Sequence, residues 1–230
     1  MPSTANILLL ETSADVCSAA LLHQGQITEK NVFEKNSHSK LLASMVSDLL
    51  ENQQCKIQEL DAIAISAGPG SYTGLRIGAS LAKGIAFAHD IPIISVSSLA
   101  SIAQALKEQE EDGDKLYCAL IDARREDVYY GIFNSNLELI EPEAFCTVNN
   151  DFLKNHLQNE IFIGGTGSLK TAKILGHNKL KVVEVDALAR HMVNIALQKY
   201  NNKEFEDLAY YEPNYIKSVH IIPSKKNVLS

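Results

Sequence analysis

Two acidic residues occupy matching places at the ends of two apolar runs. Glu11 follows Ile7-Leu-Leu-Leu10, and Asp122 follows the run Leu116–Ile121. Carboxylates at two strand ends that face each other could bind Mg²⁺ or position a water molecule. The structural alternative is that each acid closes its turn by accepting hydrogen bonds from backbone N–H groups. The turn after Asp122 has no glycine for close approach to a phosphate, which favours the structural role.

The turns that follow these acids hold the other residues that could contact a phosphate. Ser13 lies in the first turn, and Arg124 and Arg125 lie in the second. Guanidinium groups bind both phosphates and carboxylates, and on a surface they also form salt bridges. The sequence leaves these roles open and argues against ATPase activity in this chain alone.

A glycine-rich segment, Gly68-Pro-Gly-Ser-Tyr-Thr-Gly-Leu-Arg-Ile-Gly78, joins an apolar run to a long apolar segment. Strand, glycine turn and helix in this order often present backbone N–H groups to an anion. The segment lacks the Gly-Lys-Ser/Thr of a P-loop, and its glycines are one residue too far apart for the dinucleotide-binding pattern. We therefore expect it chiefly to start a helix, with Ser71 or Thr73 as the cap.

The remaining nucleophilic and metal-binding side chains form no recognisable site. The four cysteines show neither CxxC nor zinc spacing. His38 has Leu42 one helical turn later, where a second metal ligand would be needed. No serine or cysteine has a histidine in a supporting sequence context. The sequence therefore predicts no catalytic residue and no metal site.

The periodicity of the chain predicts the elements that position these residues. We expect strands over residues 6–12, 16–22, 26–33, 61–66, 92–96, 116–121, 127–133, 137–140 and 181–185, and another starting at Ile161. We expect helices over residues 38–52, 75–89, 98–110 and 186–200, the first capped by Asn36-Ser37. The charged segment Glu108–Lys115 predicts a boundary between two domains, residues 1–107 and 108–230, with a frayed tail from about residue 217.

The two halves of the chain repeat one pattern. When Asp122 is placed on Glu11, the hairpins that follow align without a gap. The apolar run and glycine turn at Ile161–Ser168 also resemble those at Ile63–Ser71. The repeat predicts an α/β fold of two duplicated subdomains with mixed sheets, in the actin-like ATPase arrangement of two ribonuclease-H-like halves across a cleft. In such folds the turn after the first strand of each half contacts nucleotide phosphates.

The composition is that of an ordinary globular protein, with 46% hydrophobic and 21% charged residues. The net charge of −7 argues against a chain that grips nucleic acid by itself, because phosphate binding requires a basic surface. No apolar run approaches the length of a membrane span, and residues 1–6 lack the basic start of a signal peptide. We expect a cytoplasmic protein with reduced, buried cysteines.

The segment 75–89 is apolar on nearly all sides, and Arg76 and Lys83 are its only charged residues before His89. A helix of this kind is buried on two sides. One side must cover the sheet of the chain itself. The other must meet the helix at 38–52, another protein, or both, so internal burial competes with a role in binding a partner.

Three segments together resemble the TsaB family, also called YeaZ: ILLLETS at residues 7–13, GPGSYTGLRIG at 68–78 and DARREDVY at 122–129. The resemblance extends over about residues 6–217, and the second segment is its most specific part. It implies a non-catalytic paralogue of the metalloprotein TsaD that works with TsaD and the ATPase TsaE. Their complex transfers a threonylcarbamoyl group to the adenosine 3′ of the anticodon in tRNAs that read codons beginning with A.

The family pairs through its two corresponding helices, with TsaD or as a homodimer when alone. The resemblance implies a partner face on helices 38–52 and 75–89, with apolar anchors and a charged rim: Leu42, Met45, Leu49, Leu75, Ala79 and Ala82, with Arg76 and Lys83. TsaD holds its metal with two histidines four residues apart, so Leu42 in place of the second one favours TsaB. The resemblance also implies that this chain contacts tRNA only as part of the complex. ATP or ADP and Mg would bind at the complex interface, and no cofactor binds this chain alone.

Two other functions stay open. One is a stand-alone actin-like kinase or ATPase with Glu11 and Asp122 as its metal acids, and the other is a metalloenzyme of the TsaD type. The segment Pro213-Asn-Tyr-Ile-Lys217 departs from the Tyr-Leu-Arg that is usual in the family. Its role is therefore left open.

Overall fold

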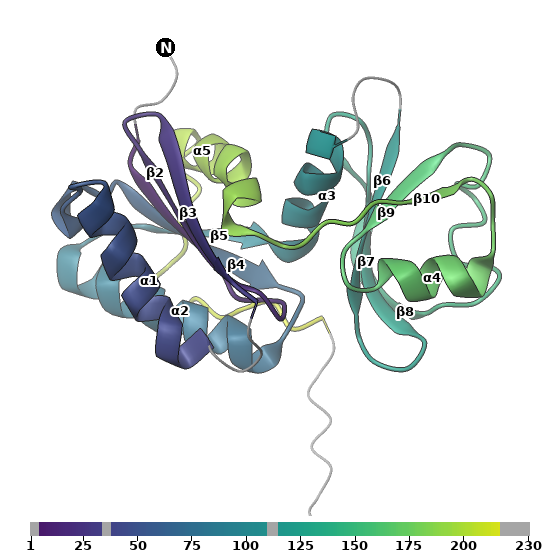
Figure 1. Cartoon of the computed structure of the whole chain (residues 1–230), viewed down its shortest axis with the longest axis horizontal. Helices are drawn as coiled ribbons and strands as arrows, with labels where there is room; N and C mark the ends of the chain where they lie inside the picture. Colours follow the sequence, from purple (N-terminus) through teal and green to yellow (C-terminus); the bar gives the residue numbers. More distant parts are fainter. Residues whose placement is uncertain (1–4, 34–37, 110–114, 217–230) are drawn as a thin grey trace, which may run out of the picture.

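Two five-stranded mixed sheets lie side by side in the computed structural model, and helices cover both faces of each (Figure 1). The structure describes residues 5–33, 38–109 and 115–216. The expected cap at Asn36-Ser37, the middle of the charged segment and the expected tail from residue 217 therefore lie outside the described residues. No helix within the described ranges is both long and apolar enough to cross a membrane.

The first sheet has the strand order β3-β2-β1-β4-β5. Strands β1, β2 and β3 are antiparallel neighbours, and β4 and β5 run parallel to β1. Side chains alternate between the two faces of β1: Leu8 and Leu10 belong to one core cluster, and Ile7 and Leu9 to another. A strand covered on both faces must be apolar throughout. The strand bounds are Ile7–Glu11, Cys17–His23, Gln26–Val32, Ala62–Gly68 and Ile93–Ser97.

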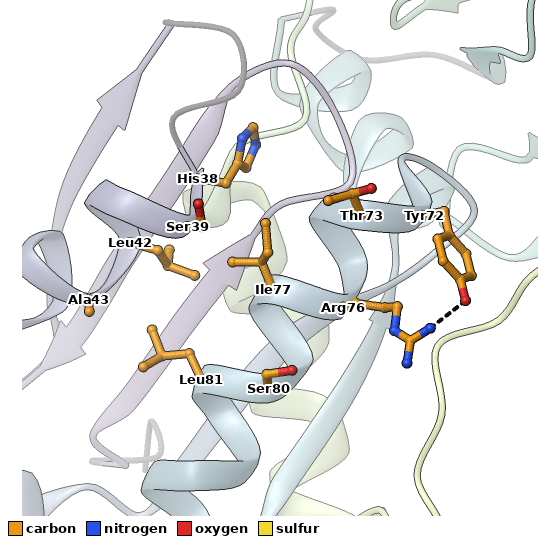
Figure 2. Close-up of a pocket in the computed structure, with 10 residues that line it drawn as sticks. All are labelled: His38, Ser39, Leu42, Ala43, Tyr72, Thr73, Arg76, Ile77, Ser80 and Leu81. Carbon is orange, nitrogen blue, oxygen red and sulfur yellow. Dashed lines mark hydrogen bonds between the residues drawn. The ribbon is translucent and has the colours of Figure 1, made fainter. Parts of the chain in front are cut away.

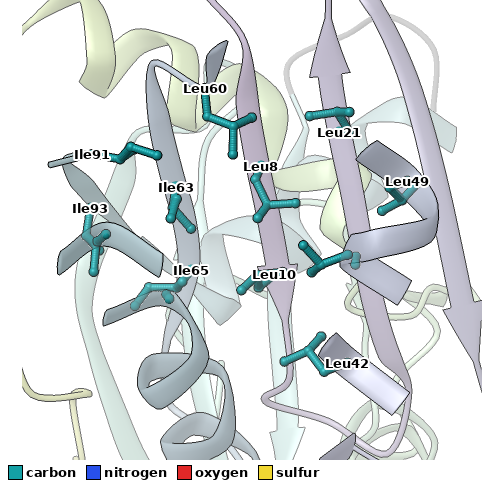
Figure 3. Close-up of a cluster of buried hydrophobic side chains, with 14 of the residues drawn as sticks. Leu8, Leu10, Leu21, Leu42, Leu49, Leu60, Ile63, Ile65, Ile91 and Ile93 are labelled. Carbon is teal, nitrogen blue, oxygen red and sulfur yellow. The ribbon is translucent and has the colours of Figure 1, made fainter. Parts of the chain in front are cut away.

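Helices α1 (His38–Asn52) and α2 (Tyr72–His89) cover one face of this sheet. Figure 3 shows how leucines and isoleucines of the strands meet the apolar side of α1. The opposite face is covered by a short 3₁₀-helix, η2 (Ala189–Met192), and by α5 (Val193–Asn201). A second 3₁₀-helix, η1 (Ile57–Glu59), precedes β4.

The second sheet repeats the first, with the order β8-β7-β6-β9-β10 and the same antiparallel and parallel pairings. Helix α3 (Ser98–Gln109) covers one face and α4 (Ser168–Leu175) the other. This repetition confirms the predicted fold class, an actin-like α/β protein with two mixed sheets. The strand bounds are Leu116–Asp122, Asp127–Phe133, Leu139–Thr147, Ile161–Gly164 and Leu180–Val182.

Most predicted elements are present, and the largest differences lie near the C-terminus. The predicted helix 186–200 is wrong at its start, because Leu188 is extended and α5 begins only at Val193. The backbone N–H of Ala189 instead donates to Ser18 Oγ (2.8 Å), which fixes this segment to β2. The strand predicted at 137–140 continues to Thr147, and the one predicted at 181–185 ends at Val182.

The two packing units are interleaved along the chain. Helix α3 follows the first sheet in sequence, yet its apolar side (Leu99, Ile102 and Leu106) packs against the second. Helix α5 follows the second sheet in sequence, yet Val193 and Ala196 pack against the first. Figure 1 shows α3 and α5 between the two sheets. The expected boundary after residue 107 therefore separates the two sequence repeats. The core of the first half, however, contains α5 from the second repeat, and the core of the second half contains α3 from the first.

Candidate functional site

A cavity of about 520 Å³ lies where the two halves meet. The turns after β1, β6 and β9 form its walls together with the start of α2. Three of the five residues considered for phosphate contact line this cleft, namely Ser13, Asp122 and Arg124. Glu11 and Arg125 do not line it.

Glu11 is fully buried at the end of β1. Its Oε1 accepts a hydrogen bond from the backbone N–H of Ser13 (2.6 Å). Its Oε2 has no hydrogen-bond partner among the described residues. Burial raises the pKa of this carboxyl, and hydrogen bonds from Ser13 offset the rise only in part. A buried carboxyl with a raised pKa is poorly suited to hold a metal ion in the cleft.

Asp122 makes the equivalent turn contact in the second half. Its Oδ1 accepts from the backbone N–H of Arg124 (2.7 Å) and from Lys170 Nζ (2.5 Å). Partial burial raises the pKa of Asp122, but the hydrogen bonds from Lys170 and Arg124 bring it below its ordinary value. Both acids thus make the turn contacts of the structural alternative. In the part of the chain that the structure describes, no three His, Cys, Asp or Glu residues are placed to hold a metal ion.

The glycine-rich segment is packed against its own chain. A Cβ on Gly70 would lie 2.4 Å from the carbonyl oxygen of Ser13, and one on Gly74 would lie 2.0 Å from that of Thr12. Ser71 caps α2, because its Oγ accepts from the backbone N–H of Gly74 (3.2 Å). The glycines therefore let the start of α2 touch the turn after β1.

A groove of about 400 Å³ runs between α1 and α2 on the outer side of the first half. Figure 2 shows Leu42 of α1 and Ile77 and Leu81 of α2 in its walls, with His38 and Tyr72 near one end. His38 is buried, and its Nε2 has no hydrogen-bond partner among the described residues. The groove is predominantly apolar and lies on the helices expected to meet a partner.

The structure corrects which residues of these helices are available. All six expected apolar anchors are buried in the chain's own core: Leu42, Met45, Leu49, Leu75, Ala79 and Ala82. Their side chains pack mainly within the chain itself, although Leu42 also lines the α1–α2 groove and Ala79 lines a second groove beside α2. Arg76 stays exposed and Lys83 is half-buried.

The outer surface of α2 includes Ser80 and Phe87, which the sequence reasoning missed, beside Arg76, which it expected at the rim. Thr73, Arg76, Ser80, Gly84 and Phe87 recur at helical spacing, and all five are exposed. We call them the α2 ridge. Phe87 is 84% exposed, the largest value for a bulky apolar residue on this helix. Plotting the helix with Ala79, Ala82 and Ala86 inward would have placed Phe87 outward.

Comparison with known proteins identifies the family. The model of the TsaD family, described as tRNA N6-adenosine threonylcarbamoyltransferase, matches residues 32–211. The tRNA threonylcarbamoyladenosine biosynthesis protein TsaB of Haemophilus influenzae is 32% identical over 92% of this chain and 93% of its own length. The Escherichia coli protein of that name is 34% identical over 92% of this chain and 94% of its own length.

A solved structure agrees with the sequence relatives. YeaZ from Pseudomonas aeruginosa has a TM-score of 0.80 and 28% identity, and the match covers 92% of this chain and 99% of the other. The relatives match over nearly the full length of the chain, and the repeated sheets and the glycine-rich start of α2 agree with that match. The chain belongs to the TsaB (YeaZ) family.

Proposed function

We propose that this chain acts in the biosynthesis of threonylcarbamoyladenosine in tRNA. It would be the non-catalytic subunit that pairs with a TsaD-type subunit, activates it and works with a TsaE-type ATPase. The observation that supports this best is the α2 ridge beside the apolar groove. A helix that covers its own sheet and still exposes a ridge of this kind is suited to packing against helices of another protein.

The shape of the ridge favours close packing of helices. Ser80 and Gly84 lie one turn apart, and a Cβ on Gly84 would meet nothing within 4 Å. Small residues let two helices approach, while a bulky exposed aromatic such as Phe87 supplies apolar contact area. Without TsaD, the same surface would pair two copies of the chain.

The cleft supports a non-catalytic role. Glu11 is turned into the protein, and Asp122 is bound by Lys170 and by its own turn. Neither carboxylate stands free beside the other to bind a metal with a nucleotide. In this proposal the chain contributes by stabilising the active arrangement of TsaD.

Substitutions on the α2 ridge test the proposal. Ser80→Arg and Phe87→Ser should each weaken co-elution with TsaD by about tenfold or more in affinity, because hot-spot contacts typically contribute over 1 kcal/mol. Threonylcarbamoyladenosine formation with TsaD, TsaE, tRNA and threonylcarbamoyl-adenylate should fall in parallel. Leu169→Ser is the matched control, since Leu169 is 67% exposed but lies on α4.

Two results would contradict this proposal. One is modification at the full rate when the chain is omitted, and the other is unchanged pairing of both ridge variants. The stand-alone kinase remains a second candidate because the cleft has room for a ligand. Calorimetry of the isolated chain with Mg-ATP separates the two, since a kinase should bind nucleotide without TsaD.

A further inference from the structure

A second groove, of about 300 Å³, lies on the opposite side of the α2 ridge. One wall is α2, and the other is the C-terminal segment from Tyr211 to Tyr215, which we call the strap. Tyr72, Arg76 and Ser80 line both this strap groove and the α1–α2 groove. A protein that packs on the ridge would therefore lie directly over the strap groove.

The walls of the strap groove are held in place before any partner arrives. Lys83 Nζ donates to the carbonyl oxygen of Tyr211 (3.1 Å), and the ring centroids of Tyr72 and Tyr215 are 4.9 Å apart. The backbone N–H of Asn214 donates to the carbonyl oxygen of Ala67 (2.7 Å). A groove with fixed walls loses little entropy when it binds a ligand.

The charge of the groove is unusual for this chain. Arg76 and Lys83 both line it, and no acidic residue occurs from Ala62 to His89 although the net charge is −7. One wall carries Glu212, which would repel a ligand with several negative charges. The two cations outnumber it, so the groove favours a carboxylate over a neutral group.

The surroundings favour a polypeptide carboxylate over a nucleotide. The ring of Tyr72 already lies under the Arg76 guanidinium, 5.2 Å from its centroid, and beside Tyr215. These contacts occupy much of the ring on which a base would stack. The groove is also continuous with the surface on which helices of a partner would pack.

We propose that the strap groove receives an acidic segment of the partner that docks on α2, with its Asp or Glu side chains pairing with Arg76 and Lys83. This inference rests on the proposed function, because the partner must first lie on the α2 ridge. Beyond the proposed function, the inference states that the partner's surface must be negatively charged where it meets Arg76 and Lys83.

The salt dependence of pairing with TsaD tests the inference. In the double variant Arg76→Gln, Lys83→Gln, we expect the affinity to fall about tenfold at low salt, and less at high salt, where charges are screened. The control Lys107→Gln, Lys173→Gln removes the same charge from exposed sites on α3 and α4. Equal salt dependence in the wild type and the double variant would overturn the inference.

A zero-length carbodiimide cross-link identifies the occupant. We expect Lys83 to be joined to an Asp or Glu of TsaD in the assembled complex, as read by mass spectrometry. Links from Lys83 only to Glu212, or only to Asp48 or Glu51 of a second copy, would overturn it. The double variant also alters the hydrogen bond from Lys83 to the carbonyl oxygen of Tyr211, whereas Arg76→Gln alone leaves it intact. A loss of affinity in Arg76→Gln alone therefore cannot be explained by the loss of that hydrogen bond.

The two proposals fail in different ways. If the ridge variants break pairing while the double variant does not, the partner face stands and the acidic segment does not. If neither set affects pairing, both proposals are wrong.

Discussion

Glu11 and Asp122 hold equivalent places in the two halves, but their surroundings shift their pKa values in opposite directions. Burial raises the pKa of Glu11. At Asp122 partial burial acts in the same sense, but hydrogen bonds from Lys170 and Arg124 outweigh it and lower the pKa. The sequence predicted their matching positions, and the turn contacts were the alternative that it favoured over a metal site. It did not predict the difference, because Lys170 is 48 residues away in the chain.

We predict that Glu11→Gln changes how stability depends on pH. A carboxyl with a raised pKa in the folded state stabilises the fold fully below its unfolded pKa, and this contribution is lost as pH rises through the folded pKa. The free energy of unfolding of the wild type should therefore fall as the pH rises above the ordinary glutamate value of 4.5 and through the raised folded-state pKa, by about 1.4 kcal/mol per unit of pKa shift. Glu11→Gln should show a smaller fall in urea titrations, because an amide does not titrate there.

Asp122→Asn is the control, because the pKa of Asp122 is shifted in the opposite direction and its effect on stability should depend on pH in the opposite way. The lowered pKa of Asp122 gives stability that is present above its unfolded pKa and lost as pH falls through the folded pKa. The cost of Asp122→Asn should thus be greatest near neutral pH and shrink below about pH 4. Because this side chain is half exposed, the cost should stay under about 1 kcal/mol. Parallel pH profiles for the two variants would contradict the assignment.

At the scale of elements, helix α2 connects the cleft with the proposed partner face. Gly70, just before the helix, and Gly74, in its first turn, touch the turn after β1, and the exposed ridge runs along the rest of the helix. Glycines at the start of the helix and in its later turns have different physical roles. The early ones permit backbone contact, whereas Gly84 faces open space.

Two glycine substitutions in α2 should therefore have opposite effects on stability. Gly74→Ala should destabilise the chain by about 2–3 kcal/mol, because its Cβ would overlap the carbonyl of Thr12. Gly84→Ala should stabilise it by about 0.5–1 kcal/mol, since alanine favours the helix and meets nothing. Thermal unfolding of the isolated chain measures both. Equal effects at the two positions would show that α2 does not contact the turn after β1 as described.

The sequence predicted α2 and its near-complete apolarity, but it could not tell which side faces inward. An amphipathic helix shows its buried side by contrast with polar residues, and α2 has too few of them. Ala79 and Ala82, two of the expected partner anchors, pack in the core cluster that also contains Leu8 and Leu10 of β1 and Ile63 and Ile65 of β4. Which side of α2 faces the sheet is decided by how its side chains pack against β1 and β4, and a single sequence does not contain that information.

At the scale of the whole molecule, the repeat in sequence and the packing units do not coincide. The strand pattern predicted the repeat and the fold class correctly, because hairpins and apolar runs are local signals. The exchange of α3 and α5 between the halves was not predicted. The packing of α5 depends on contacts between residues about 100 positions apart, such as the hydrogen bond that Lys199 Nζ donates to the carbonyl oxygen of Ser95.

The first half of the sequence should not fold alone. A fragment of residues 1–107 lacks α5, so the face of the first sheet that carries Ile7, Leu9 and Ala64 would meet water. We expect this fragment to aggregate or to unfold without a cooperative transition. Residues 1–97 joined by a flexible linker to residues 186–216 should instead show native-like circular dichroism and cooperative unfolding. A cooperative fold of 1–107 would contradict the interleaved packing.

The position of α5 also affects how the chain folds during synthesis. The first sheet is complete at Ser97, but the helix that covers its inner face starts at Val193, 96 residues later. At a translation rate of roughly 5–20 residues per second, this interval lasts about 5–20 s. During that time the apolar inner face of β1 and β4 has no native cover on the ribosome. We therefore expect the nascent chain to be most prone to aggregation during this interval.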